Sequence, residues 1–353
     1  ATTTLVSAGI EALTLEVAAS AETHKLSLTG IAATSGSNQS ITVTGGQTGA
    51  GVEIIDVSDT ATTINGSAFA GDLTLTDRGA DAMTITGGDG ADSIKMEHAN
   101  DILNAGAGSN DTLVITATGA FGATFVDLSS TTDQISQYNG NAGGSGAITN
   151  FENVDMSTIT EAGQITGSDG ANNIKGGSGA DVITAGKEDD IITGNAGIDT
   201  ITGGTGADQF RLVGNEVTID IIKDFTDGTD FITFGDNLGG VNLANTTGTA
   251  AGAVVAAGDM DSVAVGGTGW ATDQTIAIAS EGMTAAEIQA LDAAATATDG
   301  LLVVFNETTS VGEIWFDADW SAAGGEVQIA TLENLTTVGQ LTGLSNADFY
   351  AYI

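Results

Sequence analysis

Cysteine and proline are both absent from the 353-residue chain. Without cysteine, the protein can form neither a disulfide bond nor a thiolate metal site. Basic residues are scarce as well, because 7 Lys and Arg stand against 46 Asp and Glu, which gives a formal net charge of −39. Nucleic acids and anionic membranes are bound through Lys and Arg, so we expect neither as a partner. A surface this acidic should attract cations instead.

Long hydrophobic runs are missing too, since LLVVF (301–305) is typical of the longest. A membrane-spanning helix needs about 20 apolar residues, so none is expected. The first residues lack the charged and then apolar pattern of a secretory signal peptide, and we expect the chain to be a piece of a longer polypeptide. Strongly acidic chains are often disordered, but 41% of these residues are hydrophobic, which favours a folded protein.

Common catalytic motifs are also absent. The two histidines, His24 and His98, stand alone, so the zinc motif HExxH cannot occur. Neither a GxSxG nucleophile elbow nor a GxxxxGK[ST] phosphate loop is found. We therefore expect no catalysis in this chain.

Residues 1–86 contain short runs of alternating apolar and polar residues, separated by clusters of Gly, Ser, Asn and Asp. Examples are LTLEV (13–17), SITVTGG (40–46) and DLTLTD (72–77). Each run predicts a short strand followed by a turn. A sandwich of hairpins is possible, but a parallel β-helix, in which each strand stacks on its counterpart in the next coil, fits better.

A period of nine residues runs through 176–211, which reads GGSGADVIT, AGKEDDIIT, GNAGIDTIT and GGTGADQFR. This period matches neither a helix nor a simple strand pair and predicts a stacked repeat. The sixth position is always aspartate: Asp181, Asp190, Asp199 and Asp208. The eighth position is always large and apolar: Ile183, Ile192, Ile201 and Phe210.

A shorter array comes earlier in the chain. GGDGADSIK (87–95) matches the pattern GGxGxDxUx in full, where U is large and apolar. MEHANDILN (96–104) keeps only Asp101 and the apolar eighth residue. AGAGSNDTL (105–113) keeps the glycines, with Asp111 displaced by one position.

The nine-residue unit has the chemistry of a calcium site. Glycines permit positive φ and close backbone approach, so a tight turn can present carbonyl oxygens inward, and the aspartate adds an anionic oxygen. An irregular cage of oxygens suits calcium, whereas magnesium demands stricter geometry and soft metals prefer sulfur or imidazole. Gly/Asp-rich turns with solvated carboxylates are the alternative, but they would not explain the period.

We therefore expect calcium ligands at the sixth-position aspartates, at the first- and fourth-position glycines and at further acidic residues close by. The aspartates are Asp92, Asp101, Asp111, Asp181, Asp190, Asp199 and Asp208. The glycines are Gly87, Gly90, Gly176, Gly179, Gly194, Gly197, Gly203 and Gly206. The further acids are Asp89, Asp169, Asp224 and Asp230. GSDGANNIK (167–175) opens the main array but departs from the pattern, because Asn172 stands where aspartate is expected.

The arrays, followed by VTIDIIKDFTDGTDFITF (217–234), resemble the RTX proteins that Gram-negative bacteria export by type I secretion. The resemblance implies an all-β fold, a parallel β-helix or RTX β-roll, with several bound calcium ions. It also implies that the β-rich C-terminal region, which contains GEIWFDADW and NADFYAYI, carries the secretion signal. The Thr-, Ser- and Ala-rich remainder is similar to RTX-bearing S-layer proteins, which form calcium-dependent two-dimensional lattices.

These patterns divide the chain into five parts. They are a β-helical region at 1–86, a first calcium array at 87–113, a connecting β region with a Gly/Asn-rich loop at 114–166, the main array and its capping segment at 167–234, and the C-terminal region at 235–353. The capping segment is expected to be a strand pair that closes the open end of the solenoid. In the last part, Thr284 and Glu287 predict a capping box ahead of a short Ala-rich helix.

The interpretation that follows is a structural protein rather than an enzyme. It would form an S-layer lattice with copies of itself on the surface of a Gram-negative bacterium. Further partners would be the type I secretion machinery and, through a part outside this chain, lipopolysaccharide or an outer-membrane anchor. The alternatives are the calcium-binding end of a secreted adhesin and the RTX tail of a secreted hydrolase.

Overall fold

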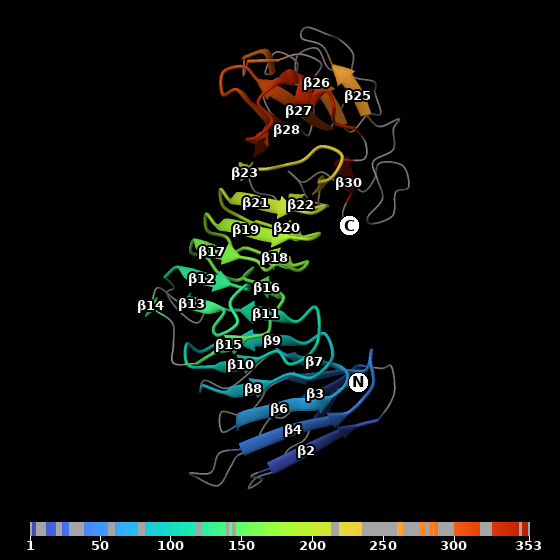
Figure 1. Ribbon diagram of the computed structural model, residues 1–353, viewed down its shortest axis with the longest axis vertical. Coiled ribbons are helices and arrows are strands. Elements are labelled where there is room, and N and C mark those ends of the chain that lie inside the picture. The colour runs from blue at the N-terminus through green and yellow to red at the C-terminus, as the bar shows by residue number, and fades with distance from the viewer. Residues whose placement is uncertain are drawn as a thin grey trace. The chain divides into compact units, whose positions relative to one another are not determined.

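The computed structural model describes residues 2–4, 12–18, 23–27, 39–55, 61–76, 82–116, 122–138, 141–142, 146–212, 219–234, 260–263, 276–279, 282–284, 286–288, 300–317, 327–345 and 348–351. They form two compact units, one of residues 1–168 and 172–174 and the other of residues 169–171 and 175–353. Strands dominate both units (Figure 1). Each unit is described by itself below.

Two parallel sheets make up most of the first unit (Figure 1). In spatial order, the strands of one sheet are β1 (Thr2–Thr4), β3 (Thr23–Ser27), β5 (Gly51–Ile55), β7 (Asp72–Leu75), β9 (Ser93–Met96), β11 (Thr112–Ile115) and β16 (Asn153–Asp155). Those of the other sheet are β2 (Ala12–Val17), β4 (Gln39–Gly45), β6 (Ala61–Phe69), β8 (Thr84–Thr86), β10 (Ile102–Asn104) and β15 (Ile148–Thr149). Successive strands from β1 to β11 alternate between the sheets and pair in parallel within them, so the predicted parallel β-helix is confirmed and the sandwich is wrong.

Alternation along each strand places the core between the two sheets. In β4, Ile41 and Val43 are buried, whereas Thr42 and Thr44 lie on the partly exposed outer face. The parallel register sets Thr42 beside Thr14 of β2, so residues of like polarity stack on the same face. Burying an aliphatic side chain of this size contributes about 1.5–3 kcal/mol. The coils are therefore held by a narrow apolar core.

The connecting region forms a small third group of strands in the first unit. They are β12 (Thr124–Asp127), β13 (Ile135–Tyr138), β14 (Asn141–Ala142) and β17 (Gly163–Thr166). β12 runs parallel to β17 and antiparallel to β13, which is antiparallel to β14. The predicted strands are confirmed, while residues 139–140 and 143–145 of the Gly/Asn-rich loop lie outside the described residues. In the sequence, β18 (Asn173–Lys175) falls at the boundary between the two units.

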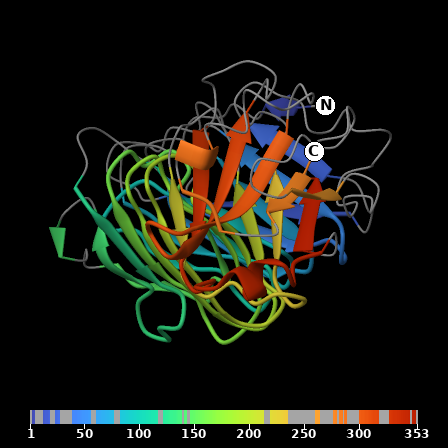
Figure 2. The same cartoon turned by 90° about the horizontal axis from the view of Figure 1, so that it is seen from above.

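The second unit continues the same construction through the main array. One sheet contains β20 (Ile191–Thr193), β22 (Gln209–Leu212), β24 (Phe231–Phe234) and β30 (Phe349–Ala351). The other contains β19 (Val182–Lys187), β21 (Thr200–Thr205), β23 (Asp220–Ile222), β29 (Val327–Leu332), β28 (Val311–Asp317), β27 (Gly300–Asn306), β26 (Ile276–Ala279) and β25 (Met260–Val263). Pairing is parallel throughout except for the antiparallel run β27–β28–β29. Seen end-on, successive coils of the array follow the same path (Figure 2).

The segment 217–234 does not close the solenoid, and that prediction is wrong. β23 and β24 lie in different sheets, and each carries a further strand on its outer side, β29 and β30 respectively. The segment continues the coils because it retains their spacing, with an apolar residue two positions after an aspartate. Ile222 follows Asp220 and Ile232 follows Asp230, and both isoleucines are fully buried.

The C-terminal region contains two short helical segments. The predicted capping box is confirmed, because Glu287 Oε2 accepts from the Thr284 N–H at 2.8 Å and Thr284 Oγ1 accepts from the Glu287 N–H at 3.4 Å. Residues 286–288 are helical and Ile288 is buried. The other helix, α2 (Val338–Leu341), is capped by the side chain of Thr337. In the part of the chain that the structure describes, no helix has the length and hydrophobicity needed to cross a membrane.

Candidate metal centre

The sixth-position aspartates are buried despite their charge. Each exposes 1% or less of its surface: Asp92, Asp101, Asp111, Asp181, Asp190, Asp199 and Asp208. A buried carboxylate is costly unless hydrogen-bond donors or a cation compensate for the lost water. The surroundings of these side chains therefore decide what the arrays can bind.

One oxygen of several of these carboxylates belongs to a ladder of hydrogen bonds that follows the stack. Asp199 Oδ1 accepts from the Asp181 N–H at 2.7 Å, across 18 residues or one full coil. In the first unit, Asp111 Oδ1 accepts from the Asp92 N–H at 2.6 Å. Hydrogen bonds to a charged acceptor are roughly twice as strong as neutral ones. The ladder thus ties each coil to the next along the line of aspartates.

The other oxygen of several carboxylates lacks a donor. Oδ2 of Asp111, Asp199 and Asp208 is buried and accepts no hydrogen bond from the described residues. Asp181 differs, because its Oδ2 accepts from the Gly177 N–H at 2.6 Å. An unpaired buried acceptor costs about 1–3 kcal/mol, and more when it is charged. A cation beside these oxygens would remove that cost.

A glycine at the first position of a repeat lets the Oδ2 atom of the sixth-position aspartate lie close to the backbone of the turn. A β-carbon added at Gly194 would lie 2.2 Å from Asp199 Oδ2, and one at Gly203 would lie 2.5 Å from Asp208 Oδ2. Both distances are far below van der Waals contact, so only glycine permits this approach. The same relation holds for the pairs Gly87–Asp92 and Gly176–Asp181.

Fourth-position glycines bring the turns of successive coils together. Gly197 has φ +112°, and a β-carbon there would lie 2.2 Å from the carbonyl oxygen of Gly179 in the preceding coil. At Gly206, with φ +150°, the corresponding distance to the Glu188 carbonyl oxygen is 1.9 Å. Carbonyl oxygens of one turn therefore face the turn stacked on it.

This donor set fits calcium. Carboxylate and carbonyl oxygens in an irregular arrangement are the ligands that calcium prefers. Among the described residues, no group of three or more His, Cys, Asp and Glu side chains suited to a metal occurs. Carbonyl oxygens of the stacked turns lie close to the glycines of the neighbouring coil. A bound ion would supply the positive charge that the unpaired Oδ2 atoms lack.

A protein-family model identifies the arrays. The model of the RTX calcium-binding nonapeptide repeat (4 copies) matches residues 84–112, 166–201 and 186–212. The chain carries RTX calcium-binding nonapeptide repeats. The matched segments contain all seven sixth-position aspartates, so the prediction of calcium-binding repeats is confirmed. No curated protein matches the chain in a sequence comparison.

Asp111 is in register in space although it is displaced in the sequence. Its RTX ladder bond to Asp92 spans 19 residues instead of 18, and Leu113, two positions later, is fully buried. The turn absorbs the extra residue through the positive φ angles of Gly106 (+114°) and Asn110 (+71°). Asp111 therefore occupies the sixth position of its coil.

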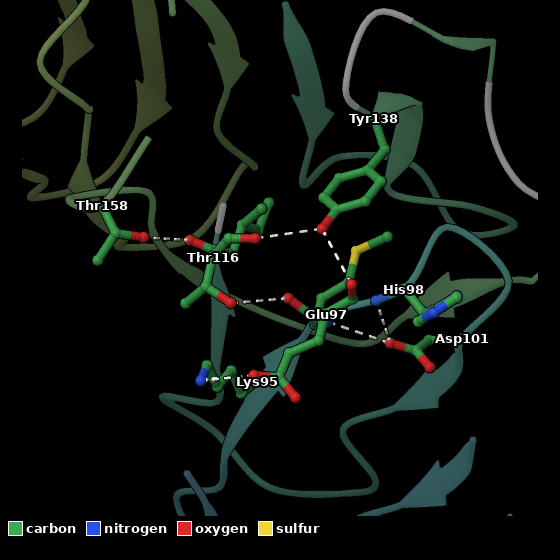
Figure 3. Close-up of polar contacts among 9 residues, drawn as sticks. Lys95, Glu97, His98, Asp101, Thr116, Tyr138 and Thr158 are labelled. Carbon is green, nitrogen blue, oxygen red and sulfur yellow. Dashed lines mark hydrogen bonds and ion pairs between the residues drawn. The ribbon is translucent and has the colours of Figure 1, made fainter. Parts of the chain in front are cut away.

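The degenerate RTX repeat around Asp101 keeps the carboxylate but not the glycine turn. Asp101 Oδ2 accepts from the N–H groups of Glu97 (3.2 Å) and His98 (3.0 Å) (Figure 3). The hydroxyl of Tyr138, from the connecting region, lies 3.3 Å from the Glu97 carbonyl oxygen and 3.1 Å from that of Thr116. The Tyr138 hydroxyl thus contacts the Glu97 carbonyl oxygen of this turn, and calcium at Asp101 stays a prediction.

Asn172 stands at the sixth position of its repeat, and its side chain both accepts and donates hydrogen bonds. Its Oδ1 accepts from the Ser168 N–H at 2.7 Å, and its Nδ2 donates to the Glu152 carbonyl oxygen at 2.6 Å. An amide can donate where a carboxylate cannot, so the Asn172 side chain is satisfied without a cation.

The additional acids predicted as ligands divide into two groups. Asp89 and Asp169, at the third position of their repeats, are exposed, and Asp169 is paired with Lys187 at 2.8 Å. Asp230 instead repeats the ladder geometry, because its Oδ1 accepts from the Asp208 N–H at 3.0 Å. Asp224 accepts from the N–H groups of the Gly203–Gly204 turn at 2.9 and 2.8 Å.

Sequence reasoning missed several acidic residues outside the RTX repeats that accept from backbone N–H groups of the preceding coil. Asp220 Oδ1 accepts from the Asp199 N–H at 3.1 Å, and the buried Ile222 two positions later was the available signal. Asp348 is 1% exposed, and its Oδ1 accepts from the Gly228 N–H at 2.9 Å. No local pattern marked Asp348, because its partner lies 120 residues earlier in the chain.

Burial raises the pKa values of several aspartates in the ladder. It raises the pKa of Asp92 and Asp208 from 3.8 to about 6 and that of Asp111 and Asp199 to about 7, and neighbouring carboxylates add to the effect. Burial likewise raises the pKa of Asp220 to about 8. Between about pH 4 and 8, the calcium-free folded state therefore holds more protons than the unfolded state.

Calcium-free protein should accordingly lose stability as the pH rises from 4.5 to 8, because folding must then place ionised carboxylates in the core. We expect the midpoint of thermal unfolding in chelator, followed by circular dichroism, to fall steadily from pH 4.5 until the cooperative transition is lost near neutral pH. With saturating calcium the trend should reverse, since protons compete with the ion for the same oxygens. A midpoint in chelator that is constant or rises with pH would contradict the assignment of these aspartates.

Proposed function

We propose that this RTX protein is secreted and works as a structural, non-enzymatic subunit that assembles with its own copies into a calcium-dependent S-layer lattice on a Gram-negative bacterium. The observation that carries the proposal is the continuity of the first unit. One sheet runs from β1 to β16 and joins coils without the nonapeptide to coils of the first array. Calcium bound in the array would therefore stiffen a long stack of coils, which a lattice subunit requires.

The excess of acidic over basic residues supports contacts between copies of the chain through bridging calcium ions. The net charge of −39 far exceeds what ions in the arrays would neutralise. Exposed acids such as Glu188 and Asp189 lie on the outside of the turns. Like-charged faces of two copies repel each other unless divalent cations lie between them. Calcium would then serve both the fold and the contacts between copies.

Export and anchoring follow from the same proposal. Type I secretion through the C-terminal region would carry the chain outside the cell, where calcium is available. Attachment to lipopolysaccharide or to an outer-membrane anchor would use a part of the protein outside this chain. The competing function is the calcium-stabilised end of an adhesin or of a secreted hydrolase, for which the array and a secretion signal would be enough.

The test is a titration of the full chain from chelator to about 10 mM calcium, followed together by circular dichroism and light scattering and then by electron microscopy. Ordered sheets that form as calcium rises would support the lattice. Magnesium at the same ionic strength is the control and should produce neither folding nor sheets. Folding to a stable monomer at every calcium concentration would exclude assembly by this chain and favour the adhesin or hydrolase tail.

A further inference from the structure

A carboxylate from outside the RTX repeats joins the ladder at Asp111. The Asp111 N–H donates to Glu152 Oε2 at 2.9 Å, the bond that an aspartate one coil later makes elsewhere. The register between β11 and β16 sets Thr112 beside Asn153, so Asp111 and Glu152 are neighbours in adjacent coils. Glu152 thus takes the sixth position of a coil whose sequence, NFENVD, has no nonapeptide pattern.

The turn that precedes Glu152 is much shorter than an RTX turn. Only residues 150–152 separate β15 from β16, whereas residues 105–111 separate β10 from β11. Asn150, with φ +64°, makes the sharp reversal, and its Nδ2 donates to Asn104 Oδ1 at 2.8 Å. A short turn offers fewer carbonyl oxygens, and the extra methylene of glutamate lets its carboxylate reach the preceding coil.

The Asp111 carboxylate lies beside Glu152, and one of its two oxygens receives no hydrogen bond from the described residues. Asp111 is fully buried, its Oδ1 accepts from Asp92, and its Oδ2 accepts no hydrogen bond from the described residues. Burial raises the pKa of Asp111, and the neighbouring carboxylates of Asp92, Glu152 and Asp72 add to the effect. A β-carbon at Gly108 would lie 3.1 Å from Asp111 Oδ2 and 2.0 Å from the Gly90 carbonyl oxygen. Anionic and carbonyl oxygens therefore gather here.

We propose that Asp111 and Glu152 together hold a calcium ion at the end of the first array, with carbonyl oxygens of the 105–110 turn and water as the other ligands. The site rests on the calcium binding proposed above but not on lattice assembly. It would join β11 of the array to β16, so calcium would hold together the two points at which the chain leaves this sheet and returns to it. A hydrated, irregular site of this kind suits calcium better than magnesium.

The test counts the calcium ions bound to the full chain by native mass spectrometry, with affinities from isothermal titration calorimetry. Glu152→Gln keeps an oxygen that can accept from the Asp111 N–H but removes the charge, and it should bind one calcium ion fewer than the wild type. Glu161→Gln is the matched control, because Glu161 lies in the same unit and accepts only from Thr160 Oγ1 (2.8 Å) among the bonds seen for its side chain. It should bind the wild-type number of ions.

Circular dichroism in calcium verifies that the variants fold. If Glu152→Gln does not fold, Asp111→Asn provides the same test, since its amide oxygen can still accept from Asp92. A folded variant of either residue that keeps the wild-type ion count and affinities overturns the proposal and leaves Glu152 as a backbone acceptor alone. Wild-type protein that binds no calcium would instead defeat the proposed function, and a lost ion without any assembly would defeat only the lattice.

Discussion

Chelation of calcium at neutral pH should abolish the cooperative unfolding transition of the RTX coils. Sites with dissociation constants of roughly 0.1–1 mM add about 0.4–1.4 kcal/mol each at 1 mM calcium. About five coupled sites then supply roughly 2–7 kcal/mol, which is comparable with the whole stability of an ordinary domain. Without the ions, the unpaired Oδ2 atoms of Asp111, Asp199 and Asp208 stay buried next to other carboxylates.

The measurement is a thermal melt by circular dichroism in chelator and at 0.1, 1 and 10 mM calcium. The midpoint should rise with each step, and strand signal should be largely lost in chelator. Adding calcium back should restore the fold, which separates ion removal from irreversible damage. An unchanged melt in chelator would show that hydrogen bonds alone hold the carboxylate ladder.

The second large effect is expected from a single methyl group at a first-position glycine. Gly194→Ala would place a β-carbon 2.2 Å from Asp199 Oδ2 and 2.9 Å from its Cγ, so the carboxylate must move. Moving it breaks the bond from the Asp181 N–H and displaces a calcium ligand. We expect a loss of about 2–4 kcal/mol, which corresponds to a drop of roughly 4–16 °C in the melting temperature.

Gly339→Ala is the matched control for this substitution. Gly339 lies in α2, where the nearest atom to an added β-carbon is Thr337 Oγ1 at 4.0 Å. The same chemical change should be neutral or slightly stabilising there, because alanine favours helix. Thermal melts and calcium titrations of both variants make the comparison. Equal behaviour of the two would mean that the Gly194 turn is not tightly packed on Asp199.

The repeats could be predicted from the sequence because their chemistry is local. Nine-residue spacing alone placed Asp199 in a turn and Ile201 in the core, since both depend on neighbouring residues of one coil. Glu152 and Asp348 could not be found in this way. Their ladder partners lie 41 and 120 residues earlier, and no local pattern encodes a pairing that depends on how the chain returns to the stack.

The error over residues 217–234 has a related cause. The density of β-branched and aromatic residues was interpreted as a terminal strand pair, whereas the informative feature was the two-residue step from Asp220 to Ile222 and from Asp230 to Ile232. Irregular turn lengths hid this step, because the ladder bonds that enter Asp220 and Asp230 span 21 and 22 residues. A search for a constant nine-residue period cannot detect coils whose lengths differ, even when hydrogen bonds between their side chains and backbone keep the aspartates aligned.

The number of residues between two ladder partners varies along the chain, and this variation shows where the protein can be altered. The same bond joins residues 18 apart at Asp181–Asp199, 22 apart at Asp208–Asp230 and 41 apart at Asp111–Glu152. Coil length is therefore free to change wherever the carboxylate still reaches the amide of the coil before it. Connections outside the glycine turns, such as the one between β11 and β16, are natural grafting points, at which a foreign loop or a whole folded domain could be displayed from the solenoid.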